Sequence, residues 1–242
     1  MEAGALLKRV LGIGYRECAV GDLRLWLDPA SNLGGRLLAE GAYEPEMTEG
    51  LKRILRPGDT FLDIGANEGW FSVVAAGCVG PAGRVYAIEP QMRMWPVLLK
   101  NAALNNCLQI EVVPTAMGAR EGEVEMALSP SLNPGASTFV IDRRRKHFQR
   151  ERVRVLTLDN LAARLALKDV RAVKIDVEGF EGEVMAGGAN FLRQRAAEYL
   201  LIEWHPLQLR ALGTDERQLA GTLAGHGYAP SPEICPDCWR RT

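Results

Sequence analysis

The stretch that most constrains the fold of this chain runs from Phe61 to Trp70 and has the sequence FLDIGANEGW. An apolar run is followed by Gly65 and Gly69, and then by apolar residues at helical spacing. This pattern predicts a strand, a glycine loop and a helix. Because Gly65 has no Cβ, a ligand can approach the backbone there, and the first N–H groups of the helix point to the same place. Open α/β sheets bind their ligands at such strand ends.

After this stretch, strand patterns and helix patterns alternate. Strands are expected at 84–89, 110–115, 123–128, 153–156, 172–176 and 200–203, and helices at 92–104, 158–167, 181–188 and 215–226. The alternation predicts an α/β fold with a mostly parallel, twisted sheet of about seven strands, the last one antiparallel, and helices on both faces. We expect one domain over residues 43–242, preceded by an extension, 1–42, with a helix and a small hairpin around Gly21.

Composition limits the classes of protein to consider. The 242 residues are 47% hydrophobic and 24% charged with a net charge of −1, which is ordinary for a soluble globular protein and does not indicate a nucleic-acid or membrane surface as partner. No apolar run reaches membrane-spanning length and no signal-peptide pattern opens the chain, so a cytoplasmic location is expected. The pair Cys235 and Cys238 has no second ligand pair nearby and is interpreted as a turn, with a disulfide or half of a metal site as alternatives.

Three features narrow the ligand of the glycine loop. Position 67 is Asn, so the loop lacks the middle glycine of a dinucleotide fingerprint, and no Gly-Lys-Ser/Thr follows as in a phosphate loop. Asp63 would repel a pyrophosphate but suits an ammonium group. Glu89 ends the next strand, about 20 residues later, where an acid can accept both hydroxyls of a ribose. Ammonium and ribose without phosphate describe S-adenosylmethionine, although Asp63 alone could be a turn cap and Glu89 a strand terminator.

These residues resemble a known family. The stretch from Phe61 to Trp70, with Ile88-Glu89-Pro90, resembles the first motif and second-strand acid of class I methyltransferases. The segment 174–181, KIDVEGFE, is similar to the signature of the FkbM family, and the likeness covers roughly residues 43–205 in the family's order. The resemblance implies a Rossmann-like methyltransferase fold, S-adenosylmethionine as methyl donor and S-adenosylhomocysteine as product. It also implies a small acceptor, often a hydroxyl of a natural product or glycan, or in some members a peptide amide nitrogen.

The resemblance and the strand positions assign the donor site. The methionine pocket is expected at Asp63, Gly65, Ala66, Asn67 and Gly69, and the ribose at Glu89. Further donor contacts are expected from residues near the ends of predicted strands and from the segment before the first one: Pro90, Gln91, Thr115, Ala116, Ser72, Tyr43 and Glu44. For Ser72 the alternative is a position on the helix surface.

The acceptor side is assigned to the ends of the later strands. Asp176 is predicted as the acceptor-side carboxylate and His205, which shares a strand side with Glu203, as an alternative base. Glu178 is either an acceptor contact or a helix-start carboxylate, and Lys174 is expected to pair with an acid. Other acceptor contacts are expected from Phe180, where the family usually has alanine, and from Asn133 and Ser137 in a loop that is either a lid or a plain connection.

Four hypotheses of function follow. The leading one is methyl transfer to a hydroxyl of a small molecule, natural product or sugar. The alternatives are methylation of a peptide side-chain amide such as that of Asn, a non-catalytic S-adenosylmethionine-binding module, and a dinucleotide oxidoreductase, which the missing glycine disfavours. The acidic residues offer hard ligands for a divalent cation, but the resemblance does not demand one, so no metal is predicted. The hairpin with Trp26 is either a homodimer interface or a lid.

Overall fold

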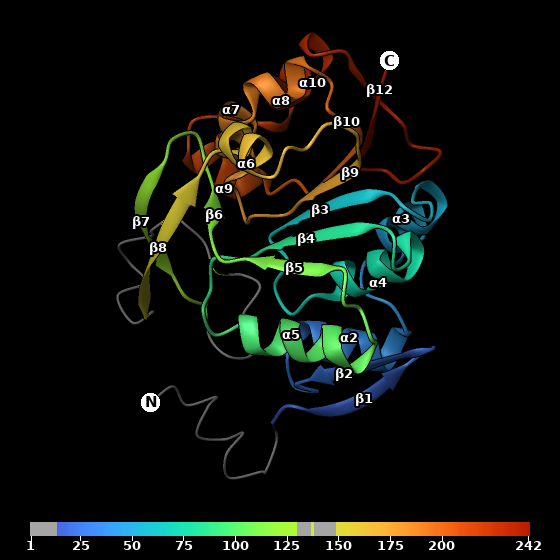
Figure 1. Ribbon diagram of the computed structural model, residues 1–242. Coiled ribbons are helices and arrows are strands. Elements are labelled where there is room, and N and C mark those ends of the chain that lie inside the picture. The colour runs from blue at the N-terminus through green and yellow to red at the C-terminus, as the bar shows by residue number, and fades with distance from the viewer. Residues whose placement is uncertain (1–13, 130–136, 138–148) are drawn as a thin grey trace.

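The computed structural model describes residues 14–129, 137 and 149–242. Its centre is a seven-stranded sheet with the strand order β11-β12-β10-β9-β3-β4-β5 (Figure 1). The strands β5, β4, β3, β9 and β10 are parallel, and β12 runs antiparallel to β10, as predicted. The bounds of the strands are β3 (Thr60–Ile64), β4 (Arg84–Ile88), β5 (Ile110–Val113), β9 (Val170–Ile175), β10 (Ala197–Ile202), β11 (Tyr228–Pro230) and β12 (Cys238–Arg241).

The strand that leads into the glycine loop, β3, lies inside this sheet. It pairs with β4 on one side and with β9 on the other, so that Asp63 lies opposite both Ala87 and Lys174. The chain passes from β3 outward to β4 and β5, and returns to the other side of β3 with β9. The strand order therefore reverses at β3, and α/β sheets bind ligands beyond the carboxyl ends of the strands at such a reversal.

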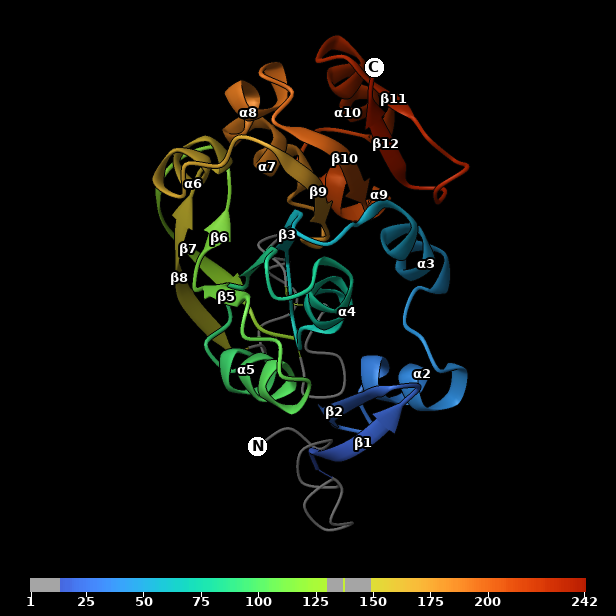
Figure 2. The same ribbon diagram turned by 45° about the vertical axis from the view of Figure 1, so that its right-hand side comes forward.

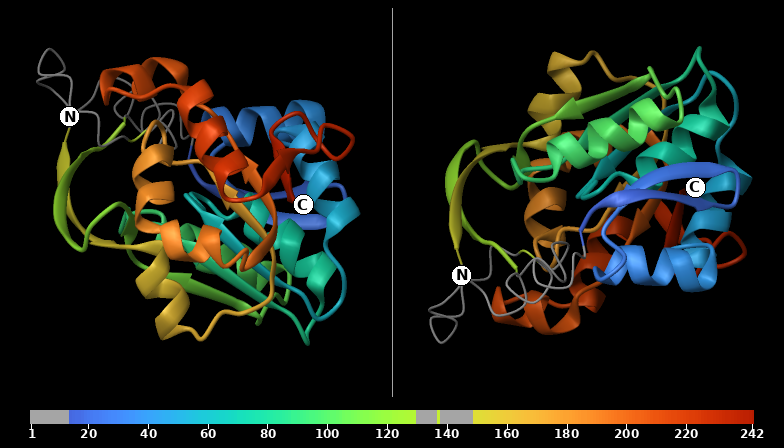
Figure 3. Two further views of the ribbon diagram at one scale, coloured as in Figure 1. Left: turned by 90° about the horizontal axis from the view of Figure 1, so that it is seen from above. Right: turned by 90° about the horizontal axis from the view of Figure 1, so that it is seen from below.

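Helices cover both faces of the sheet. Neighbouring residues of a strand point to opposite faces, and here the side chains on both faces are apolar. Phe61, Val85 and Tyr199 pack on the first face and Leu62, Val173 and Leu200 on the second. Figures 2 and 3 show the hairpin and α5 on one side and the helices after residue 157 on the other. The first face carries α2 (Asn32–Glu40), α3 (Pro45–Ile54), α4 (Trp70–Val79) and α5 (Trp95–Leu104); the second carries α6 (Leu158–Arg164), α7 (Glu181–Gly187), α8 (Ala189–Arg193), α9 (Pro206–Ala211) and α10 (Glu216–Gly225). Among the described residues, no helix combines the length and apolarity needed to cross a membrane.

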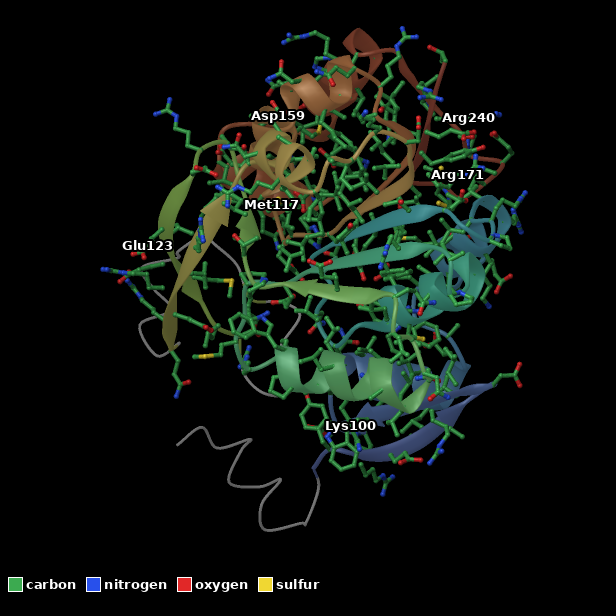
Figure 4. All side chains as sticks on the ribbon, viewed as in Figure 1. Lys100, Met117, Glu123, Asp159, Arg171 and Arg240 are labelled. Atoms are coloured by element: carbon green, nitrogen blue, oxygen red, sulfur yellow. The ribbon has the colours of Figure 1, made fainter. Side chains whose placement is uncertain are left out.

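The predicted hairpin is present as β1 (Arg16–Val20) and β2 (Leu23–Leu27) and packs on α5. The backbone N–H of Trp26 donates to Asn101 Oδ1 at 2.5 Å, and that of Arg24 donates to Asn105 Oδ1 at 3.0 Å. The ammonium of Lys100, labelled in Figure 4, lies 5.9 Å from the centroid of the Trp26 ring. The hairpin is thus attached to the domain's own helix. The helix predicted before it lies outside the described residues.

Two of the predicted strands form a second, smaller sheet instead of extending the first. In it β8 (Arg150–Leu156) pairs with β6 (Ala116–Met117) and antiparallel with β7 (Gly122–Ala127). The helices α8 and α9 were also not expected as separate elements. At the other end of the chain, Cys235 and Cys238 are free thiols in a turn, in which the N–H of Cys238 donates to the Cys235 carbonyl at 3.1 Å.

Candidate active site

The glycine loop is held between the ends of β4 and β9. The N–H groups of Gly65 and Ala66 both donate to the Ile88 carbonyl, at 2.9 and 3.1 Å. Gly65 has a φ of +85°, and a Cβ there would lie 1.8 Å from the Asp176 carbonyl oxygen. No other residue fits this position without moving one of the strand ends, because side chains disfavour this φ and the backbone of β9 occupies the space. The loop is therefore fixed by its neighbours.

Glu89 closes the other side of the loop. One carboxylate oxygen accepts from the N–H of Asn67 and the other from the N–H of Gln91, both at 2.8 Å. Burial raises the pKa of this carboxyl group to about 7, even though both hydrogen bonds favour the charged form. Each carboxylate oxygen has two lone pairs, so the group can still accept hydrogen bonds from two hydroxyls of a ligand.

A cavity of about 320 Å³ lies beyond the carboxyl ends of the strands, in the size range of small-ligand sites. Most predicted contacts line it: Tyr43, Glu44, Gly65, Ala66, Asn67, Glu89, Pro90, Gln91, Ser137, Asp176, Glu178 and Glu203. Ser137 belongs to the Glu89 side, since its hydroxyl lies 2.9 Å from Gln91 Oε1. Asn133, the other residue predicted in that loop, lies outside the described residues.

Five residues predicted to touch the donor do not line the cavity: Asp63, Gly69, Ser72, Thr115 and Ala116. Asp63 is fully buried beneath the loop, where its Oδ2 accepts from the Ser72 hydroxyl at 2.6 Å. A Cβ on Gly69 would come within 2.9 Å of the Leu98 side chain, so this glycine allows α5 to pack closely. Strand β5 ends two residues earlier than expected, and Thr115 and Ala116 turn into the second sheet.

A buried lysine links Asp63 to the cavity. Lys174 Nζ lies 3.1 Å from Asp176 Oδ2 and 3.7 Å from Asp63 Oδ1, which confirms the expected pairing with an acid. Burial alone would lower the pKa of Lys174, but the charges of Asp176 and Asp63 outweigh it and raise the pKa. Lys174 therefore pairs with Asp63 inside the protein. A contact between the Asp63 carboxylate and the ammonium of a ligand stays a prediction.

The ends of β9 and β10 bring the predicted acceptor-side residues together around one imidazole. Nε2 of His205 lies 3.5 Å from Glu178 Oε2, 3.8 Å from Asp176 Oδ1 and 3.9 Å from Glu203 Oε1. Glu178 adopts a left-handed φ of +52°, which is uncommon for a residue other than glycine and is often found at functional sites. These four side chains, His205, Asp176, Glu178 and Glu203, are called the acid cluster below.

The environment of His205 argues against its predicted role as a base. Burial lowers the pKa of the ring, but the hydrogen bond with Glu181 and the charges of Asp176 and Glu178 together raise the pKa to about 9. Without a bound cation the ring is thus protonated at neutral pH, and Nε2 can act as a base or as a metal ligand only after it loses this proton. It also does not line the cavity. Burial, followed by the charges of neighbouring acids, raises the pKa of Glu203 to about 8.

Phe180 does not lie where it was expected. It precedes α7, and its ring is directed toward Gly118, so that a Cβ on that glycine would lie 3.4 Å from it. It does not line the cavity. The bulk at this position fills a contact between α7 and the start of the second sheet instead of shaping the acceptor side.

Sequence reasoning missed the contribution of α2 and of several neighbours of the glycine loop. Arg36 stacks over the Tyr43 ring at 4.7 Å, and the Trp70 indole donates to Thr48 Oγ1 at 3.1 Å. No local motif marks α2, whereas Trp70 and Phe71 directly follow the glycine loop and could have been inferred. The missed lining residues are Asn32, Leu33, Arg36, Glu68, Trp70, Phe71, Met126, Lys174 and Val177.

One family model matches this chain, and several solved structures are similar to it. The sequence model of the methyltransferase FkbM domain matches residues 63–230. Among solved structures, the chain is similar to a precorrin-6y C5,15-methyltransferase from Geobacter metallireducens GS-15 (TM-score 0.45, 16% identity, 76% of this chain and 70% of that chain). It is also similar to a SAM-dependent methyltransferase from Aquifex aeolicus (TM-score 0.46, 18% identity, 85% of this chain and 89% of that chain). A third similar structure is fibrillarin from Aeropyrum pernix with natively bound S-adenosyl-L-methionine (TM-score 0.45, 15% identity, 92% of this chain and 82% of that chain). No curated protein matches the chain.

The sheet order, the glycine loop and the acid at the end of β4 together define a Rossmann-like methyltransferase. The chain belongs to the FkbM methyltransferase family, whose model covers more than half of it. It is therefore an enzyme, and S-adenosylmethionine is its methyl donor. The cavity residues fit this donor. Glu89 keeps lone pairs for a ligand, and Asn67 Oδ1 is buried without a hydrogen-bond partner among the described residues, as expected of a group that binds a ligand.

Proposed function

We propose that this enzyme transfers the methyl group to a hydroxyl of a small molecule, natural product or sugar. The observation that carries the proposal is the position of the Asp176 carboxylate in the wall of the same cavity as Glu89 and the glycine loop. A carboxylate at this point can accept the proton that a hydroxyl must lose on methylation. The acceptor must reach the same cavity of about 320 Å³ as the donor, which favours a small molecule over a folded macromolecule.

The donor half of the cavity is formed by residues 65–67 and 89–91, with Tyr43 and Glu44 from the chain before α3. In the proposed arrangement Glu89 accepts the ribose hydroxyls. Asn67 Oδ1 accepts from the donor's ammonium, the role first expected of Asp63. Asp63 and Ser72 act from beneath the loop as supports. Gly65 allows the donor to approach the loop backbone.

The other half of the cavity binds the molecule that receives the methyl group and holds the carboxylate that takes up its proton. When bound, S-adenosylmethionine supplies a sulfonium methyl group whose leaving group is a neutral thioether. The acceptor oxygen forms the new bond to the methyl carbon as the bond from that carbon to sulfur breaks, and its proton passes to the carboxylate of Asp176. Lys174 orients Asp176 through the 3.1 Å contact to Oδ2. Fixed placement of both reactants is worth up to roughly 7–11 kcal/mol in model reactions.

Methylation assays with isotope-labelled donor test the proposal. A panel of phenols, sugars and aliphatic alcohols is compared with peptides that contain Asn, and the products are located by mass spectrometry. We expect label on hydroxyl oxygen, and we expect Asp176→Asn to remove most of it. Transfer only to amide nitrogen would replace this proposal by the alternative that the sequence left open, methylation of a peptide side chain.

A further inference from the structure

The acid cluster has the spacing of a metal-binding site. One ligand atom each from Asp176, Glu178 and His205 lie within 4.8 Å of one another. Two ligand atoms about 2.1 Å from one ion lie roughly 3.0–3.5 Å apart at octahedral to tetrahedral angles. The 3.5 Å between His205 Nε2 and Glu178 Oε2 already fits, and the 3.8 Å to Asp176 Oδ1 needs only a small side-chain rotation.

An independent feature is the support behind the imidazole. Glu181 is fully buried, and its Oε1 lies 3.0 Å from His205 Nδ1 while also accepting from the N–H of Gly179 at 3.0 Å. The other oxygen of Glu181 is buried and has no hydrogen-bond partner in the part of the chain that the structure describes. A carboxylate on Nδ1 fixes the ring and directs Nε2 toward the cluster, which is the arrangement found behind metal-binding histidines.

The balance of charge points the same way. Carboxylates of Asp63, Asp176, Glu178, Glu181, Glu203 and Glu44 surround the site, and the cations of its described ion pairs are Lys174 and His205. Lys174 contacts Oδ2 of Asp176 at 3.1 Å, so Oδ1 remains directed toward His205. Buried charges require compensation, and a divalent cation would supply it.

We propose that Asp176, Glu178 and His205 bind a divalent cation, with Glu203 close enough to complete or replace a ligand. One imidazole with two or three carboxylates suits Mn²⁺ or Zn²⁺. Asp176, Glu178 and Glu203 line the cavity, so the remaining coordination positions face it and would hold oxygen atoms of the acceptor. The binding of acceptor oxygen atoms rests on the proposed function, whereas the cation site itself does not.

Titration of the full-length, chelator-treated protein with Mn²⁺, followed by the electron paramagnetic resonance signal of free Mn²⁺, tests the site. We expect one saturable site per chain. His205→Gln and Glu178→Gln should weaken it at least tenfold, and Glu181→Gln, which acts through the ring, about 10–100-fold. His226→Gln, at the end of α10, is the matched control and should change nothing. Absence of saturable binding, or binding indifferent to His205→Gln, would overturn the proposal.

Two further measurements keep the outcome unambiguous. Nitrogen modulation in the electron spin echo of bound Mn²⁺ reports an imidazole ligand in the unaltered protein, so the conclusion does not depend on whether the variants fold. Calorimetry with S-adenosylhomocysteine on the same sample separates the two proposals. Nucleoside binding without Mn²⁺ binding would refute the cation site alone, whereas loss of nucleoside binding would count against the proposed function.

Discussion

The two halves of the cavity are built in different ways. The donor half consists of backbone groups and one carboxylate from two short segments, 65–67 and 89–91, held by hydrogen bonds of 2.8–3.1 Å. The acceptor half consists of charged side chains that converge from the ends of β9 and β10. A rigid backbone pocket suits a ligand that never changes, here the methyl donor. Side chains can differ without disturbing the fold, and they suit an acceptor that differs between related enzymes.

The largest expected effect tests whether the halves are functionally separate. Asp176→Asn should lower kcat by about 10²–10⁴-fold, because it removes a carboxylate next to the reacting hydroxyl but keeps its shape. The affinity for S-adenosylhomocysteine should stay within about threefold. Steady-state kinetics and calorimetry measure the two effects, with the exposed Asp169→Asn as control. A parallel loss of donor affinity would show that the halves are not separate.

The donor half depends on one backbone position. Gly65→Ala should destabilise the protein by about 3–5 kcal/mol, because the positive φ and the 1.8 Å approach to the Asp176 carbonyl both exclude a Cβ. Chemical denaturation measures the change. Gly77→Ala in α4 is the control: nothing lies within 4 Å of its Cβ, and alanine favours the helix by roughly 0.5–1 kcal/mol. Equal stability of the two variants would contradict this account of the loop.

We expect Glu89 to carry the specific recognition of the donor. Glu89→Ala should weaken S-adenosylhomocysteine binding by about 10–100-fold, since hydrogen bonds to a charged acceptor contribute roughly 1.5–3 kcal/mol. The comparison variant is Glu111→Gln, an exposed carboxylate on the neighbouring strand. Calorimetry measures the affinity of both variants for S-adenosylhomocysteine. Unchanged affinity in the Glu89 variant would mean that the ribose does not bind Glu89.

The smallest effect is a dependence of donor binding on pH. Burial raises the pKa of Glu89 to about 7, so the folded carboxyl group takes up a proton at a higher pH than an exposed one would. A protonated carboxyl group has fewer lone pairs to offer, and binding should therefore weaken about tenfold from pH 8 to pH 6. Calorimetry at both values tests this, and a flat profile would indicate that Glu89 is ionised throughout.

Much of the fold and of the donor half could be predicted because the evidence is local. The glycine loop and Glu89 are each contiguous with a strand whose apolar pattern marks its end. The burial of Asp63 against Lys174 could not be predicted, because it depends on the pairing of β3 with β9, more than 100 residues apart. The same holds for Arg36 on α2, which lines the cavity although it lies far from the glycine loop in the sequence. Thr115 was misplaced because strand patterns do not show where a strand leaves its sheet.

The most direct test of the two-part cavity is a crystal structure with S-adenosylhomocysteine. We predict that the ribose hydroxyls bind Glu89 and that the sulfur lies between the glycine loop and the carboxylates of Asp176 and Glu203. The vacated methyl position would then face the acid cluster. A nucleoside bound away from Glu89, or a sulfur directed away from Asp176 and Glu203, would contradict the account.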